Sequence, residues 1–307
     1  MEELRFDGKT AIVTGAGGNP SLGRAHAMLL ASRGANVVVN DIGSKHAPGP
    51  STAQSVVDEI RALGGTAVAD DNSVATLEGA EAIVRTAIDT YGSVDILVNN
   101  AGIVFNVMVE ELAPQDYQRT IDVNVMGPLW MTRAVWPHMK AQGYGRIVNI
   151  TSGSMFGFAL QAAYAASKGA VWSMTRSNAS EGERFGIKVN AVSPGAFTRM
   201  VIGSQEEDCR TFIGTKNHMP AELVSPAVAY LAHESCPVTG ECLDVMGGGV
   251  RRTYMAWTKG INDRDLTIET VAERWDEIVA DTSDQLVPIA MNDMFTLHNK
   301  PYVPTPV

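Results

Sequence analysis

Short apolar runs alternate along the chain with longer stretches in which apolar residues recur at helical spacing. The run Val37-Val38-Val39 is apolar at every position, as is typical of strands buried on both faces of a parallel sheet. This alternation predicts βαβ units in an α/β fold, a doubly wound parallel sheet of the Rossmann type with about seven strands. The predicted strands are Ala11–Thr14, Asn36–Asn40, Ala67–Ala69, Asp95–Asn99, Arg146–Ile150, Lys188–Ser193 and Leu243–Val245. The clearest predicted helices are Ala53–Leu63, Leu77–Tyr91 and Ala162–Phe185.

The sheet-like pattern ends near Gly249, and the chain changes character beyond it. We expect a main domain over residues 1–250 and a C-terminal extension over residues 251–307, with a helix near Ile268–Ala280. The extension is short for an independent domain, so we expect it to pack on the main domain or on a neighbouring subunit. Ile42–Ser51 is predicted to be a surface loop, and Ala196–Pro220 either a plain connector or a mobile lid over a substrate.

The composition excludes several classes of protein. Of the 307 residues, 45% are hydrophobic, which is enough for a large core, and the net charge of -10 argues against nucleic-acid binding. No apolar run reaches the roughly 18 residues of a membrane span, and the first residues lack the features of a secretory signal, so we expect a cytoplasmic protein. The three cysteines do not suggest a disulfide framework, and the spacing of His233, Cys236 and Cys242 matches no common zinc site. No metal is therefore expected.

A glycine-rich turn follows the first predicted strand, between Thr14 and Gly23, and leads into a helix. Backbone N–H groups and the positive end of a helix dipole at such a turn can hold a pyrophosphate. The next strand ends in Asp41, whose carboxylate can accept both ribose hydroxyls and would repel a 2′-phosphate. The sequence therefore predicts a dinucleotide site that prefers NAD to NADP.

Tyr164 and Lys168 are four residues apart on a predicted helix, so they share one face. An ammonium close to a phenol favours the phenolate, and we expect it to lower the pKa of Tyr164 toward working pH. Tyr164 could then act as a general base in alcohol oxidation or a general acid in ketone reduction. Ser152 could hold the reacting oxygen, with Ser154 as the alternative serine.

Taken together, these motifs resemble the classical short-chain dehydrogenase/reductase family. The resemblance covers about Leu4–Gly249 and includes Asn99-Asn100-Ala101-Gly102 after the fourth strand and Ser193-Pro194-Gly195 after the sixth. It implies catalytic roles for Asn124, Ser152, Tyr164 and Lys168, with Asn124 holding a water of a proton relay, and assembly into homodimers or homotetramers. It also implies that NAD contacts Gly15, Ser21, Leu22, Gly23, Asp41, Asn72, Ser73, Asn100, Ala101, Gly102, Tyr164, Lys168, Pro194, Gly195 and Thr198.

The sequence departs from that family's usual pattern in three places. The glycine turn is two residues longer, with Ser21 near the place of the middle glycine. Ser152 precedes Tyr164 by twelve residues, where thirteen is more common. Asn72 stands where an aspartate usually meets the adenine amino group, and its side-chain oxygen can still accept a hydrogen bond.

Within the family, the chain most resembles the (3R)-hydroxyacyl-CoA dehydrogenase unit of peroxisomal multifunctional enzyme type 2, also called 17β-hydroxysteroid dehydrogenase type 4. The resemblance rests on segments such as Val39–Gly43, Leu231–Cys236 and Thr267–Trp275. It implies oxidation of a (3R)-hydroxyacyl-CoA. The alternatives are a hydroxysteroid, terpenoid or aryl alcohol, or a protein that senses the dinucleotide without catalysis. A CoA ester needs basic residues at the pocket mouth, and the candidates are Arg199, Arg210, Lys216, Arg251 and Arg252.

Overall fold

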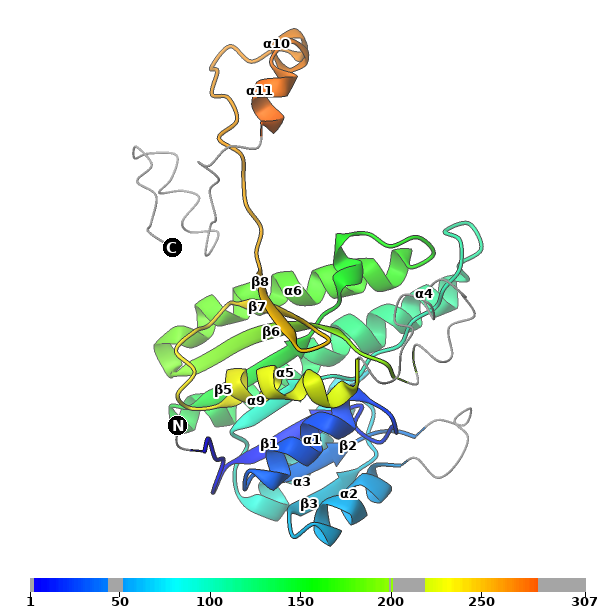
Figure 1. Ribbon diagram of the computed structural model, residues 1–307, viewed down its shortest axis with the longest axis vertical. Coiled ribbons are helices and arrows are strands. Elements are labelled where there is room, and N and C mark those ends of the chain that lie inside the picture. The colour runs from blue at the N-terminus through cyan, green and yellow to red at the C-terminus, as the bar shows by residue number, and fades with distance from the viewer. Residues whose placement is uncertain (1–2, 44–51, 199, 201–218, 281–307) are drawn as a thin grey trace. The chain divides into compact units, whose positions relative to one another are not determined.

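The computed structural model describes residues 3–43, 52–198, 200 and 219–280. Its central element is an eight-stranded sheet in the order β3-β2-β1-β4-β5-β6-β7-β8 (Figure 1). Strands β1 to β7 pair in parallel throughout. The strands are β1 (Thr10–Thr14), β2 (Asn36–Asn40), β3 (Thr66–Asp70), β4 (Ile96–Asn99), β5 (Gly145–Ile150), β6 (Ile187–Gly195), β7 (Cys242–Met246) and β8 (Gly249–Thr253). The predicted doubly wound α/β sheet is therefore confirmed, with one strand more than expected.

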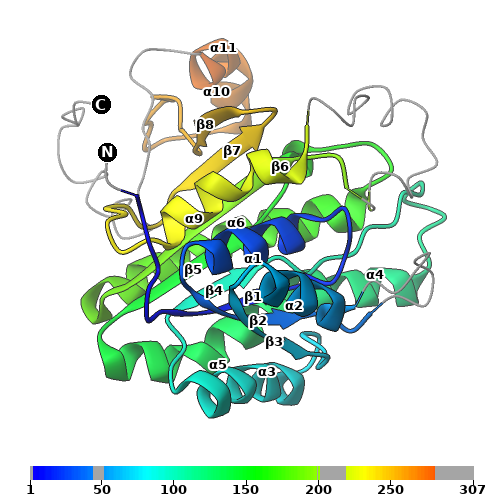
Figure 2. The same ribbon diagram turned by 60° about the horizontal axis from the view of Figure 1, so that its bottom comes forward.

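Helices cover both faces of this sheet because successive side chains of a strand point to opposite faces. On β1, Ala11 and Val13 join a core cluster with α1 (Leu22–Ser32), α2 (Ala53–Ala62) and α9 (Ser225–Ala232). Ile12 between them joins a second cluster with α3 (Leu77–Tyr91) and α5 (Gly127–Gln142). Figure 2 shows α1 and α9 on one side of the sheet and α3 and α5 on the other. This two-sided burial explains why the middle of β1 and of β2 is apolar at three successive positions.

One long helix and several short helices complete the described part of the main unit. They are α4 (Pro114–Ile121), the π-helix η1 (Asp122–Met126), the 3-10 helix η2 (Gly153–Phe156), the long α6 (Ala162–Gly182), and the 3-10 helices η3 (Glu183–Phe185) and η4 (Ala221–Leu223). Within the described part of the chain, no helix combines the length and the apolar character that crossing a bilayer requires.

Strand β8 lies where the sequence predicted the sheet to end. Gly247 and Gly248 have φ values of 55° and 85°, as in the two-residue turns that join antiparallel hairpin strands. The apolar pattern could not reveal β8, because its Val250 is 57% exposed and two arginines follow. The expected end near Gly249 is therefore wrong, and the sheet continues to Thr253.

The chain forms two compact units, residues 1–252 and residues 253–307. In the described part of the second unit, α10 (Ile268–Glu273) and α11 (Trp275–Val279) replace the single predicted helix. The break falls at Arg274, where φ is -104° and ψ is 19°. The Thr258 hydroxyl donates to the Ile278 carbonyl at 2.6 Å and ties the loop to α11.

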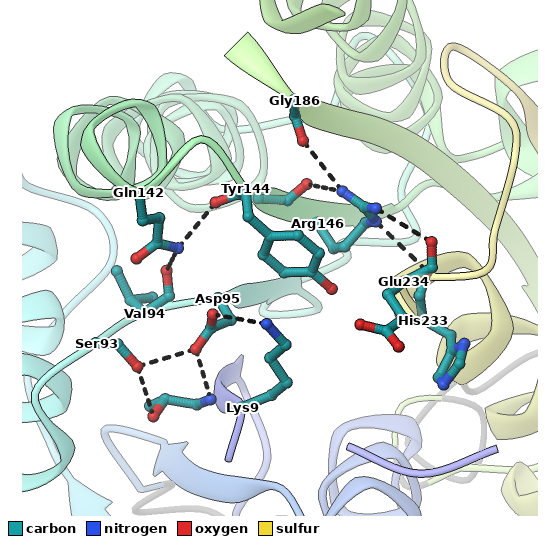
Figure 3. Close-up of polar contacts among 12 residues, drawn as sticks. Lys9, Ser93, Val94, Asp95, Gln142, Tyr144, Arg146, Gly186, His233 and Glu234 are labelled. Atoms are coloured by element: carbon teal, nitrogen blue, oxygen red, sulfur yellow. Dashed lines mark hydrogen bonds and ion pairs between the residues drawn. The ribbon is translucent and has the colours of Figure 1, made fainter. Parts of the chain in front are cut away.

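A buried arginine organises the amino edge of the main sheet (Figure 3). Arg146, 5% exposed, donates to the carbonyls of Gly145, Gly186, His233 and Glu234 at 2.8 to 3.4 Å. His233 is the C-cap of α9, so the guanidinium satisfies carbonyls at the negative end of that helix dipole. The Tyr144 ring lies between Arg146, at 4.3 Å, and Lys9, at 4.0 Å, and Lys9 pairs with Asp95 at 3.5 Å.

Candidate active site

The turn between β1 and α1 requires glycine at two places. Gly15 has φ +63°, and a Cβ there would lie 2.7 Å from the Ala101 Cα. A Cβ on Gly23 would lie 2.5 Å from the Gly15 carbonyl oxygen. The two glycines therefore bring the turn and the first turn of α1 against the loop after β4. This close backbone approach is what a pyrophosphate-binding turn needs.

Asn100 and Thr14 hold these two loops together. The Asn100 side chain donates to the carbonyls of Thr14 and Gly15 at 2.9 and 3.0 Å. In return, the Thr14 hydroxyl accepts from the N–H groups of Asn100 and Ala101, each at 3.1 Å. The predicted cofactor contacts at Gly15, Asn100 and Ala101 therefore form one hydrogen-bonded unit.

Ser21, the departure from the usual glycine pattern, is the N-cap of α1. Its hydroxyl accepts from the Arg24 N–H at 3.1 Å and donates to the Gly18 carbonyl at 2.9 Å. The longer turn is thus closed on itself by a capping serine, and Leu22 begins the helix. The helix N-terminus keeps the N–H groups and the dipole that suit an anion.

Asp41 follows β2 and faces the glycine turn. Its two carboxylate oxygens accept from the N–H groups of Gly17 and Gly43, each at 2.8 Å. A carboxylate offers about four acceptor sites, so two remain for a pair of ribose hydroxyls. Asp41 can therefore shape the turn and bind a ribose at the same time.

Asn72 and Ser73 follow β3. The Asn72 backbone N–H and side-chain N–H both donate to Asp70, at 2.9 and 3.0 Å. Because the Nδ2 atom turns toward Asp70, the Oδ1 atom turns away and can accept from an adenine amino group. The Ser73 hydroxyl accepts from the Ala75 N–H at 3.2 Å, which shapes the turn before α3.

The structure brings the three predicted proton-handling side chains together. Tyr164 and Lys168 lie one turn apart on α6, with the Lys168 Nζ 5.5 Å from the Tyr164 ring centroid. Ser152, which follows β5, lies close enough to Tyr164 to lower the pKa of its hydroxyl. Lys168 is 4% exposed and donates to the Ile150 carbonyl at 2.8 Å. Ser152 is thus the serine that acts on the tyrosine, and η2 accommodates the short spacing between them.

The expected acidity of Tyr164 is not what the structure shows. Burial raises the pKa of Tyr164 to about 12, and the Ser152 hydrogen bond offsets this rise in part. Burial also lowers the pKa of Lys168 to about 8. The expectation that the pKa of Tyr164 is lowered toward working pH is therefore wrong for this structure, because desolvation outweighs the opposite effect of Ser152.

Asn124 lies on the π-helix η1 and clamps the strand-end loop after β4. Its side-chain oxygen accepts from the Ile103 N–H and its amide donates to the Ile103 carbonyl, both at 2.8 Å. The amide also donates to the Ser167 hydroxyl of α6 at 3.1 Å. A Cβ on Gly102 would lie 3.4 Å from the Asn124 Oδ1 and 3.5 Å from the Lys168 Nζ. π-Helical turns of this kind often occur at functional sites.

The predicted nicotinamide segment lies at the carboxyl end of β6. Pro194 and Gly195 pair in register with Val245 and Met246 of β7. A Cβ on Gly195 would lie 2.7 Å from the Met246 Cγ, so the two strands approach closely there. Thr198 is half-buried just beyond the strand. These residues share the carboxyl edge of the sheet with Ser152 and Asp41, which is where open α/β sheets bind ligands.

Three polar residues lie beside the site, and no sequence motif marks them as a group. Ser154, considered before as the alternative serine, joins Gln161 and Asn106 in a chain of hydrogen bonds that begins at Ser152. Asn106 and Gln161 are isolated polar residues in two loops, 55 positions apart, and no motif marks them. Their proximity comes from the packing of the loops after β4 and β5.

Three of the five basic residues expected at the pocket mouth lie outside the described residues, and the other two form ion pairs on β8. Most of the proposed lid, with Arg199, Arg210 and Lys216, falls outside the described residues, as does most of the loop Ile42–Ser51. Arg251 pairs with Asp244 at 3.6 Å, and Arg252 pairs with Glu241 at 2.7 Å.

Comparisons with known proteins agree with this geometry. Residues 9–209 match the family model described as short chain dehydrogenase. The chain is 39% identical to peroxisomal multifunctional enzyme type 2 of Drosophila melanogaster over 90% of this chain and 46% of that protein. It therefore spans less than half the length of this relative. It is 38% identical to a short-chain type dehydrogenase/reductase of Mycobacterium tuberculosis, over 88% of this chain and 93% of that protein.

A crystal structure of a short chain dehydrogenase from Mycobacterium avium has the same fold. It superposes with a TM-score of 0.76 at 36% identity, over 89% of this chain and 94% of that one. The match extends over most of both chains. The chain therefore belongs to the short chain dehydrogenase family and is an oxidoreductase acting on CH–OH groups.

Proposed function

We propose that this chain is an NAD-dependent dehydrogenase that interconverts a (3R)-hydroxyacyl-CoA and its 3-ketoacyl-CoA. The observation that carries the reaction type is the juxtaposition of Tyr164 and Ser152, with Lys168 at the tyrosine ring, at the carboxyl edge of a Rossmann sheet. The proposed substrate class rests on the 39% identity with peroxisomal multifunctional enzyme type 2. The preference for NAD rests on Asp41, because a carboxylate repels a 2′-phosphate.

Each residue has a distinct role in the proposed reaction. Tyr164 takes the proton of the substrate hydroxyl during oxidation and returns it during reduction. Ser152 donates a hydrogen bond to the reacting oxygen and holds it beside the phenol. Lys168 would hold the nicotinamide ribose, and Asn124 would fix the loop after β4 and support the proton relay. Bound NAD supplies the nicotinamide carbon that accepts the hydride.

The protonation state of Tyr164 gives the direction of the pH dependence. Oxidation needs the phenolate, whereas reduction needs the phenol. Because burial raises the pKa of Tyr164 to about 12, the phenol predominates at neutral pH. We therefore expect the rate of alcohol oxidation to rise with pH and the rate of ketone reduction to fall.

A screen of NAD reduction tests the proposal. The panel contains (3R)-hydroxyacyl-CoAs, the matching (3S) enantiomers, hydroxysteroids, terpene alcohols and aryl alcohols, each with NAD and with NADP. We expect turnover with the (3R) thioesters and NAD, and its loss by at least about a thousandfold in Tyr164→Phe with NAD binding retained. Faster turnover of a steroid, terpenoid or aryl alcohol would replace the proposed substrate. No turnover of any alcohol with intact NAD binding would favour a dinucleotide sensor.

We also propose that the protein is cytoplasmic and forms a homodimer or homotetramer. The Drosophila relative carries the word peroxisomal in its name, so a peroxisomal location is the alternative. Fluorescence microscopy of the full chain with a peroxisomal marker tests the location. Light scattering coupled to size exclusion gives the assembly, and a monomeric mass would contradict the second proposal.

A further inference from the structure

A line of hydrogen bonds leads from the catalytic pair away into the protein. Ser152 lies beside Tyr164 and lowers its pKa, and the Ser152 hydroxyl donates to the Ser154 hydroxyl at 3.2 Å. The Ser154 hydroxyl donates to the Gln161 Oε1 at 2.8 Å, and the Gln161 Nε2 donates to the Asn106 Oδ1 at 2.8 Å. The line therefore connects the loop after β5, the residue before α6 and the loop after β4.

The direction of these bonds follows from counting protons. A hydroxyl has one proton, and Ser154 gives its proton to the Gln161 Oε1, which is an acceptor without protons. The Ser152 proton therefore goes to Ser154. The Ser152 oxygen, which also accepts from the Ser154 N–H at 3.2 Å, then has no proton left to donate toward Tyr164. In this arrangement Ser152 cannot stabilise the phenolate of Tyr164 by donating to it.

The same line can run in the opposite direction if both amides reverse. The Gln161 amide would then donate to Ser154, Ser154 to Ser152, and Ser152 to the tyrosine oxygen or to a substrate oxygen. That direction is the one required when Tyr164 ionises, because a hydrogen bond donated to the phenolate stabilises it. The orientation of the Gln161 amide therefore decides whether Ser152 accepts from the site or donates to it.

The backbone around this line is held in place. Leu160 has φ +67°, an uncommon conformation for a residue with a side chain, and its carbonyl accepts from the Val107 N–H at 2.9 Å. The Gln161 carbonyl accepts from the Ala165 N–H at 2.7 Å in the first turn of α6. The two loops are thus joined beside both amide side chains, which fixes the distance between Asn106 and Gln161.

We propose that Ser154, Gln161 and Asn106 are positioning residues that determine the direction in which the Ser152 hydroxyl donates its proton. The inference rests on the proposed catalytic roles of Ser152 and Tyr164. By controlling that direction, the three residues set the balance between phenol and phenolate at Tyr164. They also control whether Ser152 can donate to the oxygen of the substrate.

The surroundings of Tyr164 allow a change in this balance to be measured. The charged group at its ring is Lys168, from the same helix. The loop after β5 contributes the neutral Ser152, and η1 contributes the neutral Asn124, which reaches α6 through Ser167. The acidic Asp122 of η1 accepts from Gln118. Among the described residues, no carboxylate bonds to the phenol. A change in the ionisation of Tyr164 can therefore report a change of hydrogen-bond direction at Ser152.

Three variants test the proposal through the ionisation of Tyr164. Ser154→Ala removes the acceptor of the Ser152 proton but keeps the backbone N–H that bonds to Ser152. Gln161→Glu places an acceptor without protons beside Ser154, which fixes the direction seen in the structure. Asn106→Asp fixes the same direction from the end of the line. The aspartate carboxylate has no proton to donate, so it can only accept from the Gln161 amide. NMR of tyrosine labelled with 13C at Cζ, assigned with Tyr164→Phe, measures the phenolate fraction.

We expect the variants to move Tyr164 in opposite directions. At the highest pH at which circular dichroism shows the fold intact, Ser154→Ala should raise the ratio of phenolate to phenol about tenfold, one unit in pKa. Gln161→Glu and Asn106→Asp should lower it below the wild-type ratio. Ser32→Ala and Gln115→Glu make the same chemical changes at exposed positions and should leave it unchanged. A shift in the same direction in all three variants, as simple loosening of the site would give, or no shift, overturns the proposal.

Turnover separates this inference from the proposed function. The pH profile of NAD reduction should move to lower pH in Ser154→Ala and to higher pH in Gln161→Glu. If the wild type oxidises no alcohol but the NMR shifts occur as expected, the proposed function fails and the relay stands. If the wild type is active and Tyr164 ionises alike in all variants, the relay fails and the proposed function stands.

Discussion

At the scale of single residues, Lys168 is buried at a cost to stability. Burial lowers the pKa of Lys168 from 10.5 to about 8, which corresponds to about 3 kcal/mol. Between these two pH values the unfolded chain binds more protons than the folded protein, so the free energy of unfolding rises with pH in this window. Below pH 8 the full cost is present. The charged form of Lys168 therefore lowers the free energy of unfolding, although the proposed reaction uses this residue.

We predict that Lys168→Met stabilises the fold at pH 7 while it abolishes turnover. The free energy of unfolding should rise by about 2 kcal/mol. Removing the buried charge contributes about 3 kcal/mol, and losing the hydrogen bond to the Ile150 carbonyl takes back about 1 kcal/mol. Urea unfolding at pH 7 and at pH 10 measures it, and the gain should shrink at the higher pH. Lys140→Met, at an exposed position, is the control. A less stable Lys168→Met variant at pH 7 would contradict the prediction.

Asp41 carries the prediction for cofactor choice. Removing the carboxylate in Asp41→Ala deletes two charged hydrogen bonds to a ribose and the repulsion of a 2′-phosphate. We expect the Kd for NAD to rise about 10- to 100-fold and the preference over NADP to shrink. Isothermal titration calorimetry with both dinucleotides measures this, with Asp71→Ala at an exposed position as control. An unchanged ratio of the two Kd values would show that Asp41 only shapes the glycine turn.

Individual residues were predictable from the sequence where a motif fixed their spacing. The separation of Tyr164 and Lys168 on a helix guarantees a common face, and the structure has them on α6. The choice between Ser152 and Ser154 depended on the shape of η2, and the pKa of Tyr164 depended on burial. Neither depends on local sequence, so neither could be derived without coordinates.

At the scale of elements, the strands were predictable because burial on both faces leaves an unbroken apolar run. The predicted Asn36–Asn40 coincides with β2, and the predicted Leu77–Tyr91 coincides with α3. β8 escaped prediction because an edge strand with exposed residues has no such run. The π-helix η1 escaped because a π-turn has no sequence period of its own, although it positions Asn124.

Arg146 links three elements at the amino edge of the sheet, and we predict that its loss destabilises the fold without affecting the site. Arg146→Met removes a side-chain donor from four backbone carbonyls, of which those of Gly186 and His233 keep a backbone donor, and removes the cation from the C-terminus of α9. The expected loss is about 3 kcal/mol. Guanidinium unfolding measures it, and kcat/KM of the folded fraction should stay unchanged. Arg133→Met, at an exposed position of α5, is the control, and an equal effect of both variants would contradict the prediction.

At the scale of the whole molecule, the order of βαβ units was visible in the sequence, but the order of strands in space was not. Apolar periodicity says that a strand is buried and does not say which strand lies beside it. The structure places β1 between β2 and β4. This order brings the glycine turn after β1 against the loop after β4, although the two are far apart in the sequence.

The division into two units leads to a prediction about folding. All three core clusters lie between Phe6 and Val245, and in the described part of the second unit no side chain is fully buried. We therefore predict that a chain ending at Thr253, which keeps β8 whole, unfolds cooperatively with a Tm within a few degrees of the full chain. Differential scanning calorimetry measures this, and NAD binding checks the site. A broad transition without a heat-absorption peak would show that residues 254–307 are part of the same cooperative core. A cooperative transition accompanied by a smaller assembly in light scattering would instead give those residues a role between subunits.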